Sequence, residues 1–217
     1  MYGVDNVSTE LYINNSINNN DIWEFDLDYA NSNNVASFFV SDGNIHSYPA
    51  KAVPEMVHDL LYRLKEHYNV ASVLDPFVGS GTVALESKIL GLDFYGSDLN
   101  PLAVLLAKTK SLTIKNSIYV KRVLENFCED LKKPIPKGFI YKIEKFKNIE
   151  YWFKNENIEQ LSYIKYKIDT FLKKRTSKYK EVFGLVILTA FSTTIRESSL
   201  TRNDEFKLYR MTPANIS

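Results

Sequence analysis

Residues 75–82 read Asp-Pro-Phe-Val-Gly-Ser-Gly-Thr and follow a short run of β-prone residues. Two glycines two residues apart allow a tight turn and let a ligand approach the backbone N–H groups directly. The helix that we expect just after the turn would present its N-terminus, where a negative group is favoured. The segment therefore predicts a ligand-binding turn between a strand and a helix.

Asp98 stands at the end of the next β-prone run, 19 residues after Gly79. An acid about 20 residues beyond such a turn accepts hydrogen bonds from the hydroxyl groups of a ribose. Together the turn and the acid predict a βαβ site for an adenosine-type ligand. The spacing does not separate a dinucleotide from S-adenosylmethionine.

The residues of the turn narrow this choice, because they resemble the cofactor motif of the amino-group DNA methyltransferases, with related RNA methyltransferases as the chief false positive. Upstream, residues 46–51 (His-Ser-Tyr-Pro-Ala-Lys) are similar to the family segment that packs on the methionine end of the cofactor. Downstream, residues 96–103 resemble its second acidic motif. Residues 148–153 and 196–210 look like segments of one bacterial restriction-modification subfamily.

The resemblance implies S-adenosylmethionine as cofactor and assigns roles around it. Phe77 would lie against the cofactor, Asp98 would hold its ribose and Asp75 would orient the turn, unless Asp75 is an ordinary turn or capping carboxylate. Tyr48 or Lys51 would meet the methionine carboxylate or its waters, with a solvated surface lysine as the alternative. The cofactor residues predicted in this way are Tyr48, Lys51, Asp75, Phe77, Gly79, Ser80, Gly81, Thr82, Asp98 and Asn100.

Members of this family are similar in a second motif, Asp/Asn/Ser-Pro-Pro-Tyr/Phe/Trp, at the end of the fourth strand. A flipped-out base stacks on its aromatic residue, while a side chain and a carbonyl accept hydrogen bonds from the base's amino group. The seven prolines of this chain are isolated, so it contains no Pro-Pro pair. We therefore expect that this chain contains no catalytic residue and that a second polypeptide carries the motif. This chain alone is then expected not to methylate DNA. A truncated fragment is the alternative.

Apolar periodicity predicts the elements around these motifs. The expected order is helix from 53–54 onward, strand 70–74, helix 83–90, strand 93–97 and helix 102–112, then helices over 118–131, 158–172 and 182–191 and loop or extended chain over 194–210. The alternating first part favours a parallel sheet with right-handed crossovers.

With the resemblance, this order predicts an α/β fold: the N-terminal half of a Rossmann-like methyltransferase sheet plus a helical insertion, completed by a partner chain. By resemblance the first strand lies at the sheet's centre, so its unpaired edge needs that partner. The expected divisions are an Asn-rich arm (1–45), a cofactor-binding βαβα half-domain (46–116), a helical subdomain (117–192) and a basic-aromatic tail (193–217).

Basic residues mark two candidate sites for phosphate. The tail carries Arg196, Arg202, Lys207 and Arg210, which would contact the backbone of double-stranded DNA, although contact with the partner subunit is equally open. Residues 173–175 with Lys178 and Lys180 form a denser cluster, either a phosphate site or a solvated helix end. The aromatic residues 151–153 are expected to pack in a core.

Composition limits the class of protein. Lys+Arg 27 against Asp+Glu 26 gives a net charge of +1, so affinity for DNA must come from local clusters. One cysteine, Cys128, excludes an internal disulfide and is expected to be a buried thiol in a cytoplasmic protein. The three histidines show no metal-ligand spacing, so no metal is expected. The longest strongly apolar stretch, 183–191, is less than half of the roughly 20 residues that span a bilayer, so no membrane association is expected.

These observations favour one function and leave two others open. The favoured one is the S-adenosylmethionine-binding subunit of a heterodimeric, site-specific DNA methyltransferase of a restriction-modification system. By resemblance its target is the N4 group of cytosine, with the N6 group of adenine as the alternative. The others are a non-catalytic assembly or DNA-binding subunit that keeps the fold, and a fragment of an RNA methyltransferase. Cofactor affinity and its dependence on Asp98 separate the first two.

Overall fold

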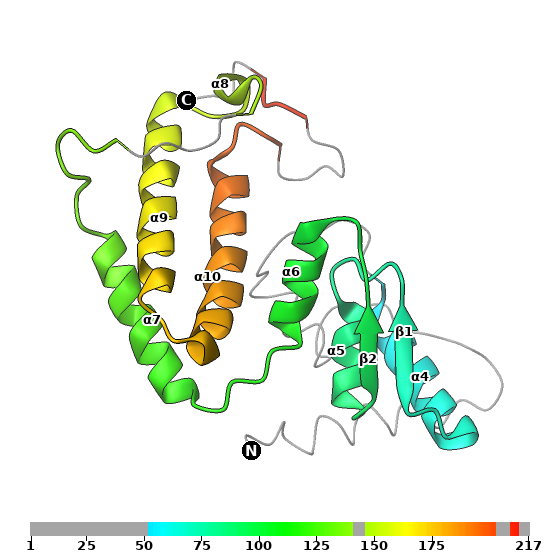
Figure 1. Ribbon diagram of the computed structural model, residues 1–217. Helices are drawn as coiled ribbons and strands as arrows, with labels where there is room; N and C mark the ends of the chain where they lie inside the picture. The colour runs from blue at the N-terminus through cyan, green and yellow to red at the C-terminus, as the bar shows by residue number, and fades with distance from the viewer. Residues whose placement is uncertain (1–51, 141–145, 203–208, 213–217) are drawn as a thin grey trace. The chain divides into compact units, whose positions relative to one another are not determined.

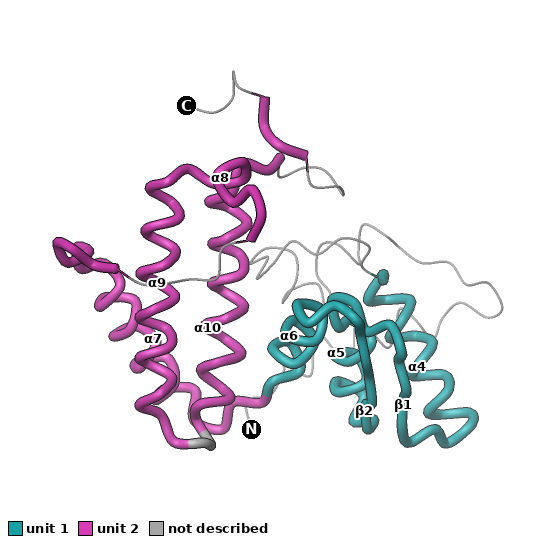
Figure 2. Tube along the Cα trace, turned by 45° about the horizontal axis from the view of Figure 1, so that its top comes forward, with its two compact units in different colours: residues 1–112 teal, residues 113–217 magenta. Residues whose placement is uncertain are grey.

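The computed structural model describes residues 52–140, 146–202 and 209–212, and the chain divides into two compact units, residues 1–112 and 113–217 (Figures 1 and 2). The arm predicted over residues 1–45 lies outside the described residues, as do Tyr48 and Lys51. Each unit has a hydrophobic core of its own.

The first unit follows the predicted order of strands and helices. Its elements are α4 (Pro54–Tyr68), β1 (Ser72–Asp75), α5 (Thr82–Ile89), β2 (Asp93–Gly96) and α6 (Pro101–Lys110). The two strands pair in parallel, from Ser72 opposite Asp93 to Asp75 opposite Gly96. Pro54 opens α4, where its missing N–H is tolerated. The predicted parallel pairing is therefore confirmed, with element ends displaced by one or two residues.

Helices α4 and α5 cover one face of this small sheet (Figure 1). Val57 and Leu61 of α4 and Leu92 before β2 form the core there, with Val73, Val83 and Leu90 packed against them. Because side chains alternate along a strand, Leu74 and Tyr95 lie on the opposite face. They are partners in the strand register and are 75% and 62% exposed.

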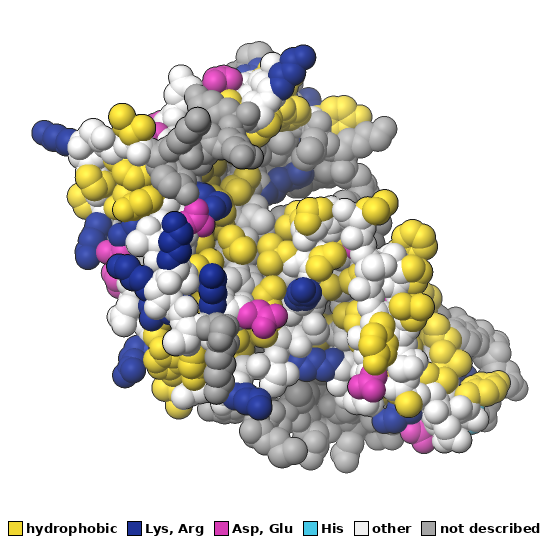
Figure 3. Space-filling model, in the orientation of Figure 1, with side chains coloured by type: hydrophobic (Ala, Val, Ile, Leu, Met, Phe, Trp, Pro, Cys, Tyr) yellow, Lys and Arg dark blue, Asp and Glu magenta, His cyan; other side chains and the backbone are white. Residues whose placement is uncertain are grey.

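Figure 3 shows hydrophobic side chains gathered over β1 and β2 on the face turned to the viewer. A parallel sheet is ordinarily covered by helices on both faces. Among the described residues this sheet has two strands, so one edge of β1 also has no neighbouring strand. In the described part of the first unit, one face of the sheet and the outer edges of both strands are therefore open.

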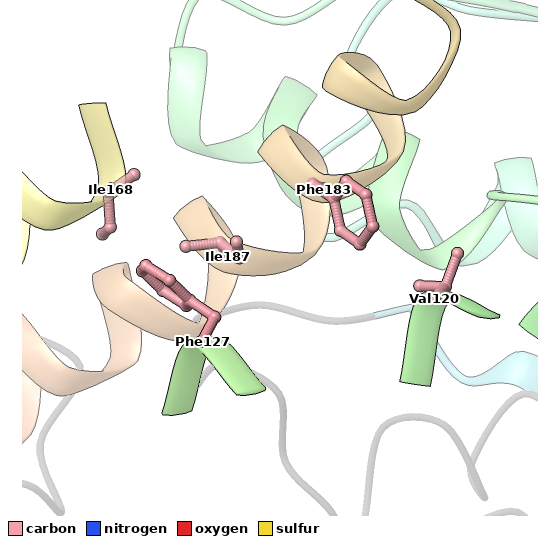
Figure 4. Packing of buried hydrophobic residues seen from close by; sticks show 5 residues of the cluster. All are labelled: Val120, Phe127, Ile168, Phe183 and Ile187. Atoms are coloured by element: carbon pink, nitrogen blue, oxygen red, sulfur yellow. The ribbon is translucent and has the colours of Figure 1, made fainter. Parts of the chain in front are cut away.

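The second unit is helical. Its elements are α7 (Ser117–Leu131), α8 (Ile149–Trp152), α9 (Asn155–Lys173) and α10 (Ser177–Ser198). Its core brings Val120 and Phe127 of α7 against Ile168 of α9 and Phe183 and Ile187 of α10 (Figure 4). Outside this core, Lys167 of α9 forms an ion pair with Asp130 of α7. The three predicted helices are confirmed.

Two predictions for this unit were wrong. The chain from Thr194 to Ser198 is helical, because α10 continues to Ser198, whereas loop or extended chain was expected. Hydroxyl groups in this turn bond back to carbonyls four residues earlier, as Thr194 Oγ1 does to the oxygen of Ala190 at 3.0 Å, so they do not break the helix. Cys128 is exposed, because the neighbouring Phe127 takes the core-facing position of α7.

After α10 the chain turns back past α8. The N–H of Leu200 donates to the carbonyl of Trp152 at 2.7 Å, and Thr201 pairs with Arg210 in an antiparallel bridge. Of the predicted aromatic core residues, Phe153 is buried and Tyr151 is half exposed. No helix within the described ranges has the length and apolar character that a lipid bilayer would require.

Candidate functional site

The glycine turn after β1 is built from its own side-chain and backbone bonds. Asp75 Oδ1 accepts from the N–H of Phe77 at 2.9 Å, and the N–H of Gly81 donates to the carbonyl of Val78 at 2.9 Å. Gly79 (φ 51°) and Gly81 (φ 83°) both adopt the left-handed region, which favours glycine. Asp75 thus holds the N–H of Phe77 in the turn, a bond that both roles predicted for this carboxylate allow.

Gly81 has a second reason to be glycine. A Cβ built on it would lie 2.5 Å from the Cα and 2.8 Å from the Cβ of Ala107 on α6. The sequence suggested that the glycines let a ligand approach the backbone. At Gly81 the close neighbour is instead a helix of the same unit, and the residue is needed for the packing of α5 against α6.

The Asp98 carboxylate links the chain after β1 to the chain after β2 through hydrogen bonds. Its Oδ2 accepts from the N–H of Gly79 at 2.8 Å, and its Oδ1 accepts from the N–H of Asn100 at 2.8 Å. These two backbone bonds hold the pKa of the Asp98 carboxyl below its usual value, so the group is ionised at neutral pH. A carboxylate has about four lone-pair sites, so each oxygen keeps room for one more donor.

The start of α6 completes the connection between the strands. The Asn100 side chain accepts from the N–H of Leu102 at 3.0 Å and caps the helix. The N–H of Ser97 donates to the carbonyl of Asp75, and the N–H of Val78 donates to the carbonyl of Ser97. The predicted residues of the turn and of the second motif therefore lie together at the carboxyl ends of β1 and β2, where open α/β sheets bind ligands.

The N-terminus of α5 offers backbone donors to this region. Helix α5 has no side-chain cap, and no described residue accepts a hydrogen bond from the N–H groups of Ser80, Thr82 or Val83. The hydroxyl groups of Ser80 and Thr82 are 3.5 Å apart, and both residues are buried. The site can therefore present N–H groups at the positive end of a helix to a negative ligand group.

Two large apolar side chains are exposed beside these polar groups. Phe77, which was predicted to contact the cofactor, is 85% exposed, and Leu99 is fully exposed. Leu99 was not among the residues predicted to bind the cofactor, because that prediction rested on polar groups and on the glycine turn. The available signal was an apolar residue directly after the acid that ends β2. Apolar side chains here suit the flat faces of a purine ring.

The predicted DNA-binding residues lie in the second unit, and two of them make bonds within it. Arg210 Nε donates to the carbonyl of Tyr151 at 2.8 Å, and its guanidinium carbon lies 4.6 Å from that residue's ring centre. Arg196 Nη2 lies 3.4 Å from the carbonyl of Arg202. Lys207 lies outside the described residues. Arg196 and Arg210 thus hold the tail against its own unit.

In the basic cluster at residues 173–175, the side chain of Arg175 packs on two aromatic rings. The Arg175 guanidinium carbon lies 4.2 Å from the ring centre of Phe171 and 5.6 Å from that of Phe183. Its Nε is buried without a hydrogen-bond partner in the described part of the chain. This side chain packs on the helical core and is not presented as a phosphate ligand. The described residues include no cluster of three acidic, histidine or cysteine side chains suited to a metal ion.

The family and the relatives that match this chain are all DNA methylases or Type II methyltransferases. The DNA methylase family of the N6/N4 group matches residues 6–109. A Type II methyltransferase, M.MvaI from Kocuria varians, is 34% identical over 181 residues, which cover 79% of this chain and 37% of that protein. A second, M.MjaII from Methanocaldococcus jannaschii, is 39% identical over 67 residues, or 30% of this chain and 12% of that protein. No solved structure matches the chain.

The chain spans little more than a third of the length of the first relative. The family match lies within the first unit, which contains the glycine turn and Asp98. An alignment over 79% of the chain is longer than either unit. The similarity to M.MvaI therefore includes helices of the second unit as well.

Replacing Gly81 with alanine should destabilise the fold more than replacing Gly91. Both glycines have positive φ, which costs an alanine about 1–2 kcal/mol. Only Gly81→Ala adds a collision, with Ala107, of the kind that typically costs about 1–3 kcal/mol more. Denaturant unfolding of both variants measures the difference. Equal losses of stability would show that the contact with Ala107 is not tight.

The contribution of Asp98 to stability should depend on pH in a definite direction. Its folded-state pKa is lowered, so the ionised group stabilises the fold above the ordinary pKa near 3.8 and this effect is lost as the pH falls through the folded-state value. Asp98→Asn should therefore lower the unfolding midpoint at pH 7, with the difference from the natural chain disappearing in acid. Asp93→Asn, at the exposed start of β2, is the control and should show no such change. A difference that is constant with pH would contradict the assignment.

Proposed function

The chain belongs to the amino-group DNA methyltransferase family, and on this basis we propose that its first unit binds S-adenosylmethionine for methyl transfer to an exocyclic amino group of DNA. Cytosine N4 is favoured over adenine N6, because the subfamily that the sequence resembles more often modifies cytosine. The observation that carries the proposal is the ionised Asp98, held by backbone N–H groups beside the glycine turn. The family generally uses this cofactor.

Three features of the described residues fit such a ligand. The remaining lone pairs of Asp98 suit the two hydroxyl groups of a ribose. The N–H groups of Ser80 and Thr82 at the start of α5 suit the methionine carboxylate. The exposed Phe77 and Leu99 suit the apolar faces of the adenine. When bound, the cofactor supplies an electrophilic methyl group on a sulfonium, and the residues named here hold and orient it.

The motif that binds the flipped-out base is expected on residues other than these 217. Direct transfer to an exocyclic amine needs the nitrogen lone pair aimed at the methyl carbon, with acceptors for the amino hydrogens and an aromatic platform. The sequence holds no Pro-Pro pair for the family's motif of this kind. We propose that a second polypeptide brings that motif together with the remaining strands of the sheet.

The open side of the first unit supports this proposal. Leu74 and Tyr95 form an exposed apolar pair across β1 and β2, on the face away from α4 and α5. The outer edge of β1, which has no neighbouring strand among the described residues, presents backbone donors and acceptors to a further strand. A partner that adds a strand there and covers the open face would bury both features at once.

We propose that the basic tail residues contact the phosphate backbone of DNA: Arg196, Arg202, Lys207 and Arg210. Arg196 and Arg210 each already make a bond within the second unit. Arg210 has five N–H donors and uses Nε in that bond, so further donors remain for a phosphate. Such contacts would position the duplex without reading its sequence.

Asp98→Ala in the assembled enzyme should weaken cofactor binding about 10–100-fold, the scale of losing charge-assisted hydrogen bonds. Equilibrium dialysis with radiolabelled S-adenosylmethionine measures the dissociation constant. Asp93→Ala, which removes a carboxylate at the other end of β2, is the matched control and should leave it unchanged. An unchanged dissociation constant in Asp98→Ala would remove this residue from the site and favour the non-catalytic alternative.

The chain should transfer methyl groups to DNA only when it is mixed with a polypeptide that carries the Pro-Pro motif, such as the product of an adjacent reading frame. Tyr95→Asp should abolish this complementation, because it places a charge on the open face of the sheet. Tyr68→Asp changes another exposed tyrosine, at the end of α4, and should not affect it. Methyl transfer by the chain alone would end the two-polypeptide proposal.

A further inference from the structure

Helices α4 and α5 are joined by a buried polar pair. His58 Nδ1 lies 2.8 Å from Glu86 Oε2, and the two side chains are only 4% and 3% exposed. Burial raises the pKa of the Glu86 carboxyl, with the hydrogen bond and charge of His58 opposing the rise. Glu86 Oε1 has no hydrogen-bond partner among the described residues. Keeping a buried carboxyl group with an unpartnered oxygen between two helices is costly, so the pair calls for an explanation beyond stability.

The position of Glu86 connects this pair with the glycine turn. Glu86 is one helical turn beyond Thr82, the first residue of α5. His58 is one turn beyond Pro54, the first residue of α4, which follows the segment 46–51 that resembles the methionine-end motif. The pair therefore ties together the two helices that directly follow the two predicted cofactor-binding segments.

The apolar contacts between the described parts of α4 and α5 are less restrictive than this hydrogen bond. Val57, Leu61 and Leu92 form an apolar contact, which is non-directional and tolerates small shifts of one helix along another. A hydrogen bond requires both distance and angle. A second polar contact, from Lys65 Nζ to the carbonyl of Leu90 at 2.8 Å, holds the far end of α5. Of these two polar contacts, the His58–Glu86 bond is the one nearer the turn.

We propose that His58 and Glu86 form a positioning pair that fixes the start of α5, and with it the N–H groups of Ser80 and Thr82, in the place that cofactor binding requires. This inference rests on the proposed function of the first unit. Neither side chain touches the cofactor in this role. The contact acts through the helix, so a neutral side chain that keeps the hydrogen bond should also keep the affinity.

The decisive variant is the double substitution His58→Leu/Glu86→Met, which replaces the pair by apolar side chains of similar size. Such replacements of buried pairs are often neutral or stabilising, so the unfolding midpoint should be maintained. The dissociation constant for S-adenosylmethionine, measured by equilibrium dialysis on the assembled enzyme, should nevertheless rise at least tenfold. Glu86→Gln keeps a hydrogen-bonding partner for His58 and should stay within about threefold of the natural protein.

Lys65→Met is the matched control, because it removes the polar contact at the other end of α5 and should leave the dissociation constant unchanged. If the double variant does not fold, Glu86→Met and Glu86→Gln are compared directly, and equal affinities in the two would overturn the inference. An unchanged affinity in a folded double variant would also overturn the inference, but it would leave the proposed function intact. If the natural protein did not bind the cofactor, the proposed function would be contradicted. The positioning role of the pair, which depends on that function, would then be contradicted as well.

Discussion

The carboxylate of Asp98 is the group on which the geometry of the first unit's site depends. Through the N–H of Gly79 it holds the turn after β1, and through the N–H of Asn100 it holds the start of α6. A single ionised side chain thus joins the ends of both strands. The same bonds that order the backbone lower the pKa of Asp98 and keep it charged, so the turn is stabilised and the site remains negative at neutral pH.

A second constraint is the small size of the sheet in the described part of the first unit. Two parallel strands give little stability by themselves, and the described part of the first unit covers them on one face. The apolar pair of Leu74 and Tyr95 is the consequence of that arrangement. Exposed apolar side chains that lie together on a strand pair are typical of a surface that another element covers.

The second unit shows how basic residues can have structural roles. Arg175 packs on aromatic rings of the helical core, and Arg210 docks on Tyr151. A guanidinium group stacks well on an aromatic face, so arginine at such a place is not interchangeable with lysine. A count of basic residues along the sequence therefore includes arginines whose side chains already have partners within their own unit.

The sequence determined the order of the elements, the glycine turn, the acid after β2 and the family, because strand and helix periods, glycine spacing and motif letters are local properties. It also showed that no Pro-Pro motif is present. Only the tertiary structure decided that Gly81 is required by Ala107, that Asp98 accepts from the N–H of Gly79, and that His58 and Glu86 meet between helices. Each of these depends on contacts between residues far apart in the chain, which neither periodicity nor composition records.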